Sequence, residues 1–154
     1  MTTEIPTGKP LKLLHMLYRK GKPATTYTIK LKQSELAQQL SISRQALNVH
    51  LRKLRDGRHI RTGRGFIDVT EKGLKTLGIS VDPAFVFVKV SPLRRGEAYR
   101  QVSKLPIERI FRVTGDMDAI LMIEQGKLDE TLKKLAAVEG IQETKSYVTI
   151  QTLK

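Results

Sequence analysis

Four polar side chains recur along one predicted helix, and their types suit hydrogen bonding to a nucleic acid. Arg44 and Gln45 open the helix, while Asn48 and Arg52 follow at intervals of four residues. Guanidinium and amide groups carry donors and acceptors that match the edges of base pairs in a major groove. The same pattern is also typical of an amphipathic helix whose polar face meets only water. The sequence of the neighbouring segments is therefore needed to distinguish these two interpretations.

Two short helices joined by a tight turn are predicted to position these side chains. The first begins at Gln33 or Ser34, and the small residue Ala37 lies where the two helices would cross closely. Ser43 is predicted to cap the second helix, because its hydroxyl can accept a hydrogen bond from an amide of the following turn. Behind the polar face, the second helix carries a leucine stripe at the i, i+4, i+7 spacing of a buried side: Leu47, Leu51 and Leu54.

The segments before this helix pair predict a supporting helix and a short strand. Pro10 suits a first helical position, and apolar residues recur at helical spacing until Gly21 and Pro23 end the pattern. Residues 25–32 are rich in Thr, Tyr and Ile with partial alternation, which indicates a strand. Residues 1–9 show little periodicity, so we expect a flexible tail there.

A hairpin and a third helix are predicted after the helix pair. Residues 60–69 place β-branched and aromatic flanks around a glycine-containing turn that carries Arg64. Thr70 is predicted to cap a short helix over residues 71–77, which Gly78 ends. The hairpin resembles the wing of a winged helix-turn-helix, which favours the nucleic-acid interpretation of the polar helix face.

Residues 10–78 as a whole resemble the winged helix-turn-helix domains of bacterial and archaeal transcription regulators. The strand that runs into SELAQQLSISRQAL is most similar to the catabolite-activator type. This resemblance implies that Arg44 and Gln45 read the major groove, and that Val49 replaces an arginine at a third reading position. Valine can meet a thymine methyl group. His50 replaces an aliphatic core residue of that family, and we expect a structural role for it.

The residues expected to contact DNA come from the second helix and the wing. The residues on the polar face of the helix are expected to contact base edges. The remaining Lys and Arg side chains are expected to contact phosphates or the neighbouring minor groove. The full set is Ser43, Arg44, Gln45, Asn48, Val49, Arg52, Lys53, Arg55, Arg61 and Arg64.

The charge distribution separates two parts of the chain. The formal net charge is +13, and residues 1–80 hold 16 Lys and Arg against 5 Asp and Glu, whereas residues 81–154 hold 12 against 10. Such a basic part favours a polyanionic partner, either nucleic acid or an acidic membrane surface, although a generally basic soluble protein is the simpler alternative. A glycine and a proline place the boundary in a linker over residues 79–84.

Composition excludes several kinds of chemistry. The chain has no cysteine and three scattered histidines, so thiol catalysis, disulfides and the usual transition-metal clusters are not expected. No stretch approaches the roughly 18 apolar residues that span a bilayer, and we expect a soluble, cytoplasmic protein. Asp116 and Asp118 form a close carboxylate pair, for which building a turn is at least as suitable a role as catalysis.

The pattern after the linker predicts a ferredoxin-like βαββαβ sandwich over residues 85–154, so the expected fold class is α+β. Its predicted strands are 85–90, 109–113, 119–123 and 144–151, and its helices are 93–104 and a segment around residues 128–136 that Gly140 ends. Alternation puts Phe85, Phe87 and Tyr147 on the face opposite Val86, Val88, Val148 and Ile150. Both faces are therefore apolar, and a partner subunit is the economical cover for the face without helices. The sequence predicts a homodimer, with a tetramer or octamer as further assembly.

The segment VFVKVSPLRRGEAYRQVSKLP and the later RVTGDMDAILMIE resemble the effector-binding, dimerising domain of leucine-responsive (Lrp/AsnC-type) regulators, over roughly residues 84–152. The resemblance implies that a small effector, often an amino acid, binds near the turn that contains TGDMDA. The residues carried over by this resemblance are Thr114, Gly115, Asp116, Met117, Asp118 and Ala119.

These observations favour a sequence-specific, double-stranded-DNA-binding transcription regulator that acts as a homodimer or higher oligomer, with no enzymatic activity, cofactor or metal. The alternative is a chromatin-like protein that coats DNA with little sequence preference, because phosphate contacts alone supply non-specific affinity. A small-molecule enzyme is the third and weakest interpretation, since convergent nucleophiles, bases and metal ligands are not evident.

Overall fold

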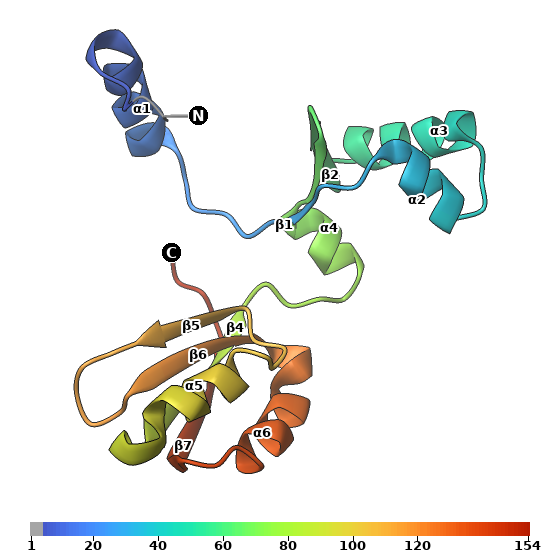
Figure 1. The fold of residues 1–154 in the computed structure, drawn as a ribbon. Coiled ribbons are helices and arrows are strands. Elements are labelled where there is room, and N and C mark those ends of the chain that lie inside the picture. Colours follow the sequence, from blue (N-terminus) through green and yellow to red (C-terminus); the bar gives the residue numbers. More distant parts are fainter. Residues whose placement is uncertain (1–4) are drawn as a thin grey trace.

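The computed structural model describes residues 5–154, and the first four residues of the predicted tail lie outside the described part. The chain forms an N-terminal winged helix-turn-helix and a C-terminal βαββαβ sandwich (Figure 1), so the predicted α+β fold is confirmed. The N-terminal elements are α1 (Gly8–Lys20), β1 (Tyr27–Ile29), α2 (Gln33–Gln39), α3 (Arg44–Asp56), β2 (Ile60–Gly63), β3 (Phe66–Val69) and α4 (Glu71–Thr76).

Local hydrogen bonds explain where the N-terminal helices begin. The Ser43 Oγ accepts from the Ala46 N–H at 3.1 Å, and the Thr70 Oγ accepts from the Gly73 N–H at 3.2 Å, as predicted for caps of α3 and α4. At α2 the Glu35 carboxylate reaches back to accept from the Lys32 N–H at 3.0 Å. Each cap satisfies amides that have no partner inside the helix.

The three short strands form an antiparallel sheet in the order β1-β3-β2. The predicted strand over residues 25–32 is shorter than expected, because only Tyr27 to Ile29 have partners on the four-residue strand β3. A small core lies between this sheet and the helices, and its buried apolar side chains are Ala37, Leu47, Ile60, Ile67 and Leu74.

The C-terminal elements are β4 (Pro83–Val90), α5 (Arg95–Val102), β5 (Arg109–Arg112), β6 (Ala119–Glu124), α6 (Leu128–Ala136) and β7 (Ile141–Val148). The sheet order is β5-β6-β4-β7, with every neighbouring pair antiparallel, and both helices pack on one face (Figure 1). Alternate residues of β4 and β6 fill the core beneath those helices, among them Val86, Val88, Leu121 and Ile123.

The predicted last strand was wrong by three residues at each end. Gly140, at a φ of 96°, turns the chain so that Ile141 already pairs with Val90. At the other end Val148 pairs with Ala84 near the start of β4, so residues beyond it have little strand left to pair with. Ile150 consequently lies outside the strand and is 99% exposed rather than covered.

One hydrogen bond connects the two halves of the chain, whereas helix α1 is separate from both halves. The Tyr27 hydroxyl of β1 donates a hydrogen bond to the Glu108 carboxylate beside β5 at 2.9 Å, which links the winged half to the sandwich. By contrast, α1 stands clear of both parts (Figure 1) and contains no buried residue, although it begins and ends close to the predicted positions.

Candidate nucleic-acid interface

The exposed side of α3 gathers the base-reading types predicted from the sequence. Helical geometry places Gln45, Asn48 and Arg52 on one side, at successive turns, and all three are exposed. Arg44 is exposed at the first turn. Leu47 lies on the opposite side and is buried against the rest of the winged half. The helix is therefore anchored through Leu47, and its polar side is exposed.

Val49 and His50 take different positions around α3. Val49 is 52% exposed and adjoins Gln45 and Arg52 on the polar side, where its methyl groups are available for an apolar contact. His50 is also exposed, but helical spacing puts it on the leucine side, between the directions of Leu47 and Ala46. Its position thus differs from that of the polar residues predicted to meet DNA.

The wing stands next to the C-terminal end of α3. Gly63 pairs with Phe66, which leaves Arg64 and Gly65 as the two turn residues, and Gly65 adopts a φ of 83°. The Arg55 guanidinium of α3 lies 3.5 Å from the Thr62 Oγ of β2. This contact brings a basic side chain of the helix to the base of the wing.

Arg61 differs from the other predicted contacts because it already has an acidic partner. Its guanidinium lies 3.3 Å from the carboxylate of the buried Asp68, which also accepts a hydrogen bond from the Thr28 Oγ at 2.6 Å. Asp68 thereby satisfies its charge across the three-stranded sheet. The Arg61 side chain remains 65% exposed, so part of its guanidinium still faces solvent.

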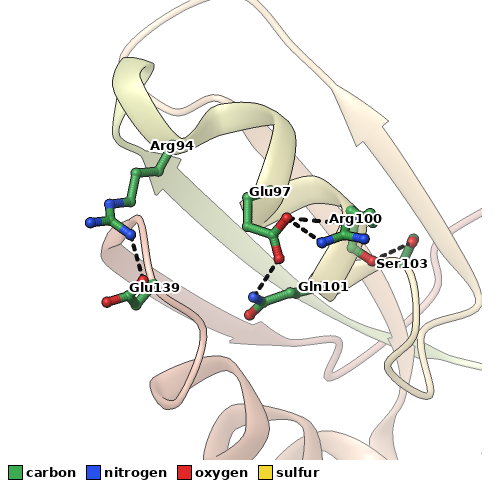
Figure 2. Close-up of polar contacts among 6 residues, drawn as sticks. All are labelled: Arg94, Glu97, Arg100, Gln101, Ser103 and Glu139. Carbon is green, nitrogen blue, oxygen red and sulfur yellow. Dashed lines mark hydrogen bonds and ion pairs between the residues drawn. The ribbon is translucent and has the colours of Figure 1, made fainter.

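Positive charge is compensated unevenly along the chain. Of the seven ion pairs formed within residues 5–154, six lie in the C-terminal sandwich and one, Arg61 with Asp68, lies in the winged half. Figure 2 shows two of the six: Arg94 pairs with Glu139, and Arg100 pairs with Glu97, which also accepts from Gln101. Hydrogen bonds from Gln101 and Arg100 lower the pKa of Glu97. Basic side chains on the winged half are left to attract an external anion.

The turn between β5 and β6 holds the residues predicted to bind an effector. Thr114, Gly115 and Asp116 are exposed at its tip, and Gly115 has a φ of 133° that favours glycine. Asp118 instead anchors the turn, because its carboxylate accepts from the Val90 N–H at 2.8 Å and from Arg95 at 3.2 Å. Ala119 is buried. Of the predicted set, Thr114 and Asp116 therefore have exposed side chains, whereas Met117 and Asp118 are half-buried.

Apolar side chains cluster on the face of the sheet opposite α5 and α6, where they are half-buried or exposed, and Met122 at one end lines a cavity against the winged half. Strand register puts Phe87, Ile120 and Phe111 side by side across three strands, and the rings of Phe87 and Tyr147 meet edge to face at 5.3 Å. Arg109 stacks its guanidinium over the Phe111 ring at 4.9 Å. We call this surface, formed by Phe85, Phe87, Phe111, Ile120, Met122 and Tyr147, the open sheet face.

Sequence reasoning missed the contact between Tyr27 and Glu108. These residues border a cavity of about 80 Å³ between the winged half and the sandwich, which Leu74, Pro83 and Met122 also line. Burial and the hydrogen bond to Glu108 raise the pKa of Tyr27 to about 12. The residues are 81 positions apart, so no local pattern in the sequence could have paired them.

Comparisons with known proteins support the fold. No protein-family model and no curated protein sequence matches the chain. Among solved structures, a transcriptional regulator of Neisseria meningitidis, NMB0573, solved as a complex with L-Met, is similar over 97% of this chain and 93% of its own, at 20% identity and a TM-score of 0.52. AsnC of Escherichia coli is similar over 92% of this chain and 90% of its own, at 22% identity and a TM-score of 0.50. The chain therefore shares its two-part fold with these proteins.

Within residues 5–154, no three His, Asp or Glu side chains come together in a way that could hold a metal ion. Within the same residues, no helix combines the length and apolar character that crossing a membrane requires.

Proposed function

We propose that this protein is a sequence-specific DNA-binding transcription regulator. The observation that carries this proposal is the exposed polar side of α3, mounted on a winged helix-turn-helix whose basic side chains have few acidic partners. The exposed residues that would meet base edges in the major groove, as helices of this architecture do, are Arg44, Gln45, Asn48 and Arg52. The two solved regulators that share the fold support the same function.

The unit that binds DNA comprises residues 10–78 in this proposal, joined through residues 79–84 to an assembly unit over residues 85–154. Lys53, Arg55 and Arg64 would meet phosphates, and Arg64 would enter the neighbouring minor groove from the tip of the wing. The strand before α2 and the hairpin after α3 support the resemblance to the catabolite-activator type. In this arrangement, one unit would recognise DNA and the other would join the subunits.

The assembled form in this proposal is a homodimer that pairs through the open sheet face. Its aromatic and aliphatic side chains would lose their contact with water, which favours association. A two-fold axis would then present two copies of α3 to half-sites separated by about 10 bp or a multiple of that distance. Tetramers or octamers would form from such dimers.

A small effector, such as an amino acid, would bind beside the turn between β5 and β6. The L-Met complex of the Neisseria meningitidis regulator supports an amino acid as the chemical class. In this chain the exposed Thr114 and Asp116 would supply polar contacts, while Asp118 holds the turn in place. No metal or cofactor takes part in this proposal.

Substitutions on α3 test the reading function. Gln45→Ala should relax the base preference by roughly 1–3 kcal/mol if the amide makes a bidentate contact, whereas Lys53→Ala should weaken all sequences alike and reduce the salt slope by about one unit. Binding to an operator selected from random DNA, measured over a range of salt concentrations, separates the two effects. Unchanged affinity and preference in both Gln45→Ala and Arg44→Ala would contradict the assignment of α3.

A second function, a chromatin-like coat, is favoured by one observation, the formal charge of +13. Phosphate contacts and counterion release supply affinity for any sequence. Genome-wide binding profiles distinguish the two functions, because a regulator gives discrete peaks and a coat gives even coverage. Repeating the profile with a panel of amino acids tests the effector.

A further inference from the structure

Helix α1 is apolar over a wide side, yet the described residues 5–154 bury none of its side chains. Leu13, Leu14 and Leu17 are each at least half exposed, and Tyr18 is 82% exposed. The helix contains no buried residue, and it stands away from α2, α3 and the sheet (Figure 1). Isolated helices of about this length are marginal in water, so helical stability normally comes from packing an apolar side. This helix therefore needs a surface to cover.

The winged half has a matching surface that its own chain leaves uncovered. On the leucine side of α3, Leu54 is 44% exposed and Leu51 is half-buried, and Leu40, at the C-terminal end of α2, is 61% exposed. Helical spacing directs Leu51 and Leu54 away from Gln45 and Arg52, so a helix packed there would leave the DNA-reading side free. The buried core of this half is small, as expected of a helical domain that lacks one of its layers.

The connection between α1 and β1 leaves the helix in an extended direction. Gly21 leaves the helix in an extended conformation, with φ of −71° and ψ of 150°, and residues 21–26 form no helix or strand. Pro23 restricts the residue before it to extended backbone. Pairing with β3 then fixes the chain from Tyr27 onward. Six extended residues reach about 20 Å, enough to carry α1 to a neighbouring molecule.

We propose that α1 of one chain packs on Leu40, Leu51 and Leu54 of a second copy, and that the exchange is reciprocal. Each reading unit is then completed by a helix of the other chain, in the manner of a domain swap. The polar side of α1 carries Lys12, His15 and Arg19 with no acidic residue in the helix, so pairing two α1 helices directly would bring like charges together. Packing on the leucine side of α3 avoids that repulsion and keeps the basic side in solvent.

This exchange deepens the proposed function but does not depend on it. It concerns how two chains hold each other, and it adds positive charge from the partner's α1 to each reading unit. If the chain proved to bind no DNA, the contact between α1 and α3 would still be present. The test therefore measures the contact itself.

Engineered cysteines provide that test, because the natural chain contains none. Two differently tagged full-length chains, one with Leu14→Cys and one with Leu54→Cys, are co-expressed, oxidised and separated on a non-reducing gel. A disulfide-linked pair of unlike chains is expected at a yield at least tenfold above the control pair of Lys12→Cys with Leu54→Cys. Lys12 lies on the polar side of α1, so it should not reach Leu54 of the other chain.

Three results would overturn the exchange. A mixed pair that crosslinks no better than the control shows that α1 does not contact α3 of another chain. A chain carrying both Leu14→Cys and Leu54→Cys that closes an internal disulfide without linking chains shows that α1 folds back. Dominant linkage of Leu14→Cys to itself shows pairing of α1 with α1. If circular dichroism reveals that Leu54→Cys has lost structure, Leu17→Cys with Leu40→Cys measures the same contact.

Discussion

Asp118 shows, at the scale of one residue, how one carboxylate anchors a turn whose tip stays exposed. Its carboxylate accepts from the Val90 N–H and from Arg95, and its backbone N–H donates to the Val88 carbonyl at 2.9 Å. Val90 is buried, so its amide has no access to water if the carboxylate is removed. Asp116, two residues earlier, is exposed at the tip of the same turn.

Asp118→Ala should lower the free energy of unfolding by roughly 1–3 kcal/mol, because it leaves a buried amide without an acceptor. Asp116→Ala is the matched control and should change stability by less than about 0.5 kcal/mol. Urea unfolding followed by circular dichroism measures both. Equal stability of the two variants would show that the Asp118 contacts contribute nothing to the sandwich. An effect of Asp116→Ala on amino-acid binding alone would separate the ligand role from the anchoring role.

The roles of residues whose partners lie close in the sequence could be predicted, whereas the roles of residues with distant partners could not. The capping roles of Ser43 and Thr70 follow from neighbours three residues away, and the structure confirms both. The pairing of Arg61 with Asp68 was not predicted, because it depends on the hairpin register that sets the two directly opposite each other. Tyr27 and Glu108 meet only once both halves have folded.

At the scale of elements, α4 packs so closely on the connection before the wing that only glycine fits at one position. A Cβ built on Gly73 would lie 2.3 Å from the His59 carbonyl oxygen and 2.9 Å from a Val69 methyl carbon. The Thr70 amide also donates to the His59 carbonyl at 3.0 Å, which fixes that backbone in place. The start of the wing is thus positioned by close backbone contact between α4 and His59, the residue before β2.

Gly73→Ala should destabilise the winged half by roughly 1–3 kcal/mol through this overlap. Gly96→Ala in α5 is the control, because a Cβ there meets nothing within 4 Å, and it should be neutral or stabilising by up to about 1 kcal/mol. Thermal unfolding of both variants gives the comparison. If Gly73→Ala proved as stable as Gly96→Ala, the close approach of α4 to the wing would be wrong.

Element boundaries were predicted well where a cap or a glycine marks them, and poorly where only pairing decides. The helices from α2 to α4 begin at the predicted residues, whereas β7 begins three residues earlier than its alternation indicated. β7 is an edge strand exposed along most of its length, so its burial does not mark where it begins and ends. Its extent is set by the length of β4, which the sequence of β7 does not contain.

At the scale of the whole molecule, assembly through the open sheet face requires its aromatic cluster. Phe87→Arg places a charge at the centre of that surface, beside Ile120 and Tyr147, and it should shift the chain from dimer to monomer with a loss of at least tenfold in dimer affinity. Leu93→Arg is the control, because Leu93 is 96% exposed outside the open sheet face. Sedimentation equilibrium at micromolar concentration measures both, and a wild-type monomer would contradict the proposed dimer.

The link between the two halves can be followed through one titration. Burial, followed by the hydrogen bond to Glu108, raises the pKa of Tyr27 to about 12 from the ordinary value of 10.0. A raised pKa means that the folded chain holds this proton more tightly than the unfolded chain does. The stability that comes from the protonated phenol is therefore complete below pH 10 and is lost as the pH rises towards 12.

Tyrosinate absorbance can isolate this group, since the chain has four tyrosines and no tryptophan. The difference between the titration curves of the natural chain and Tyr27→Phe should have its midpoint near pH 12. Glu108→Gln should move that midpoint only part of the way towards 10, because burial is the larger cause and persists. A midpoint at 10 in the natural chain would mean that Tyr27 faces water, and that the winged half does not rest against the sandwich through this contact.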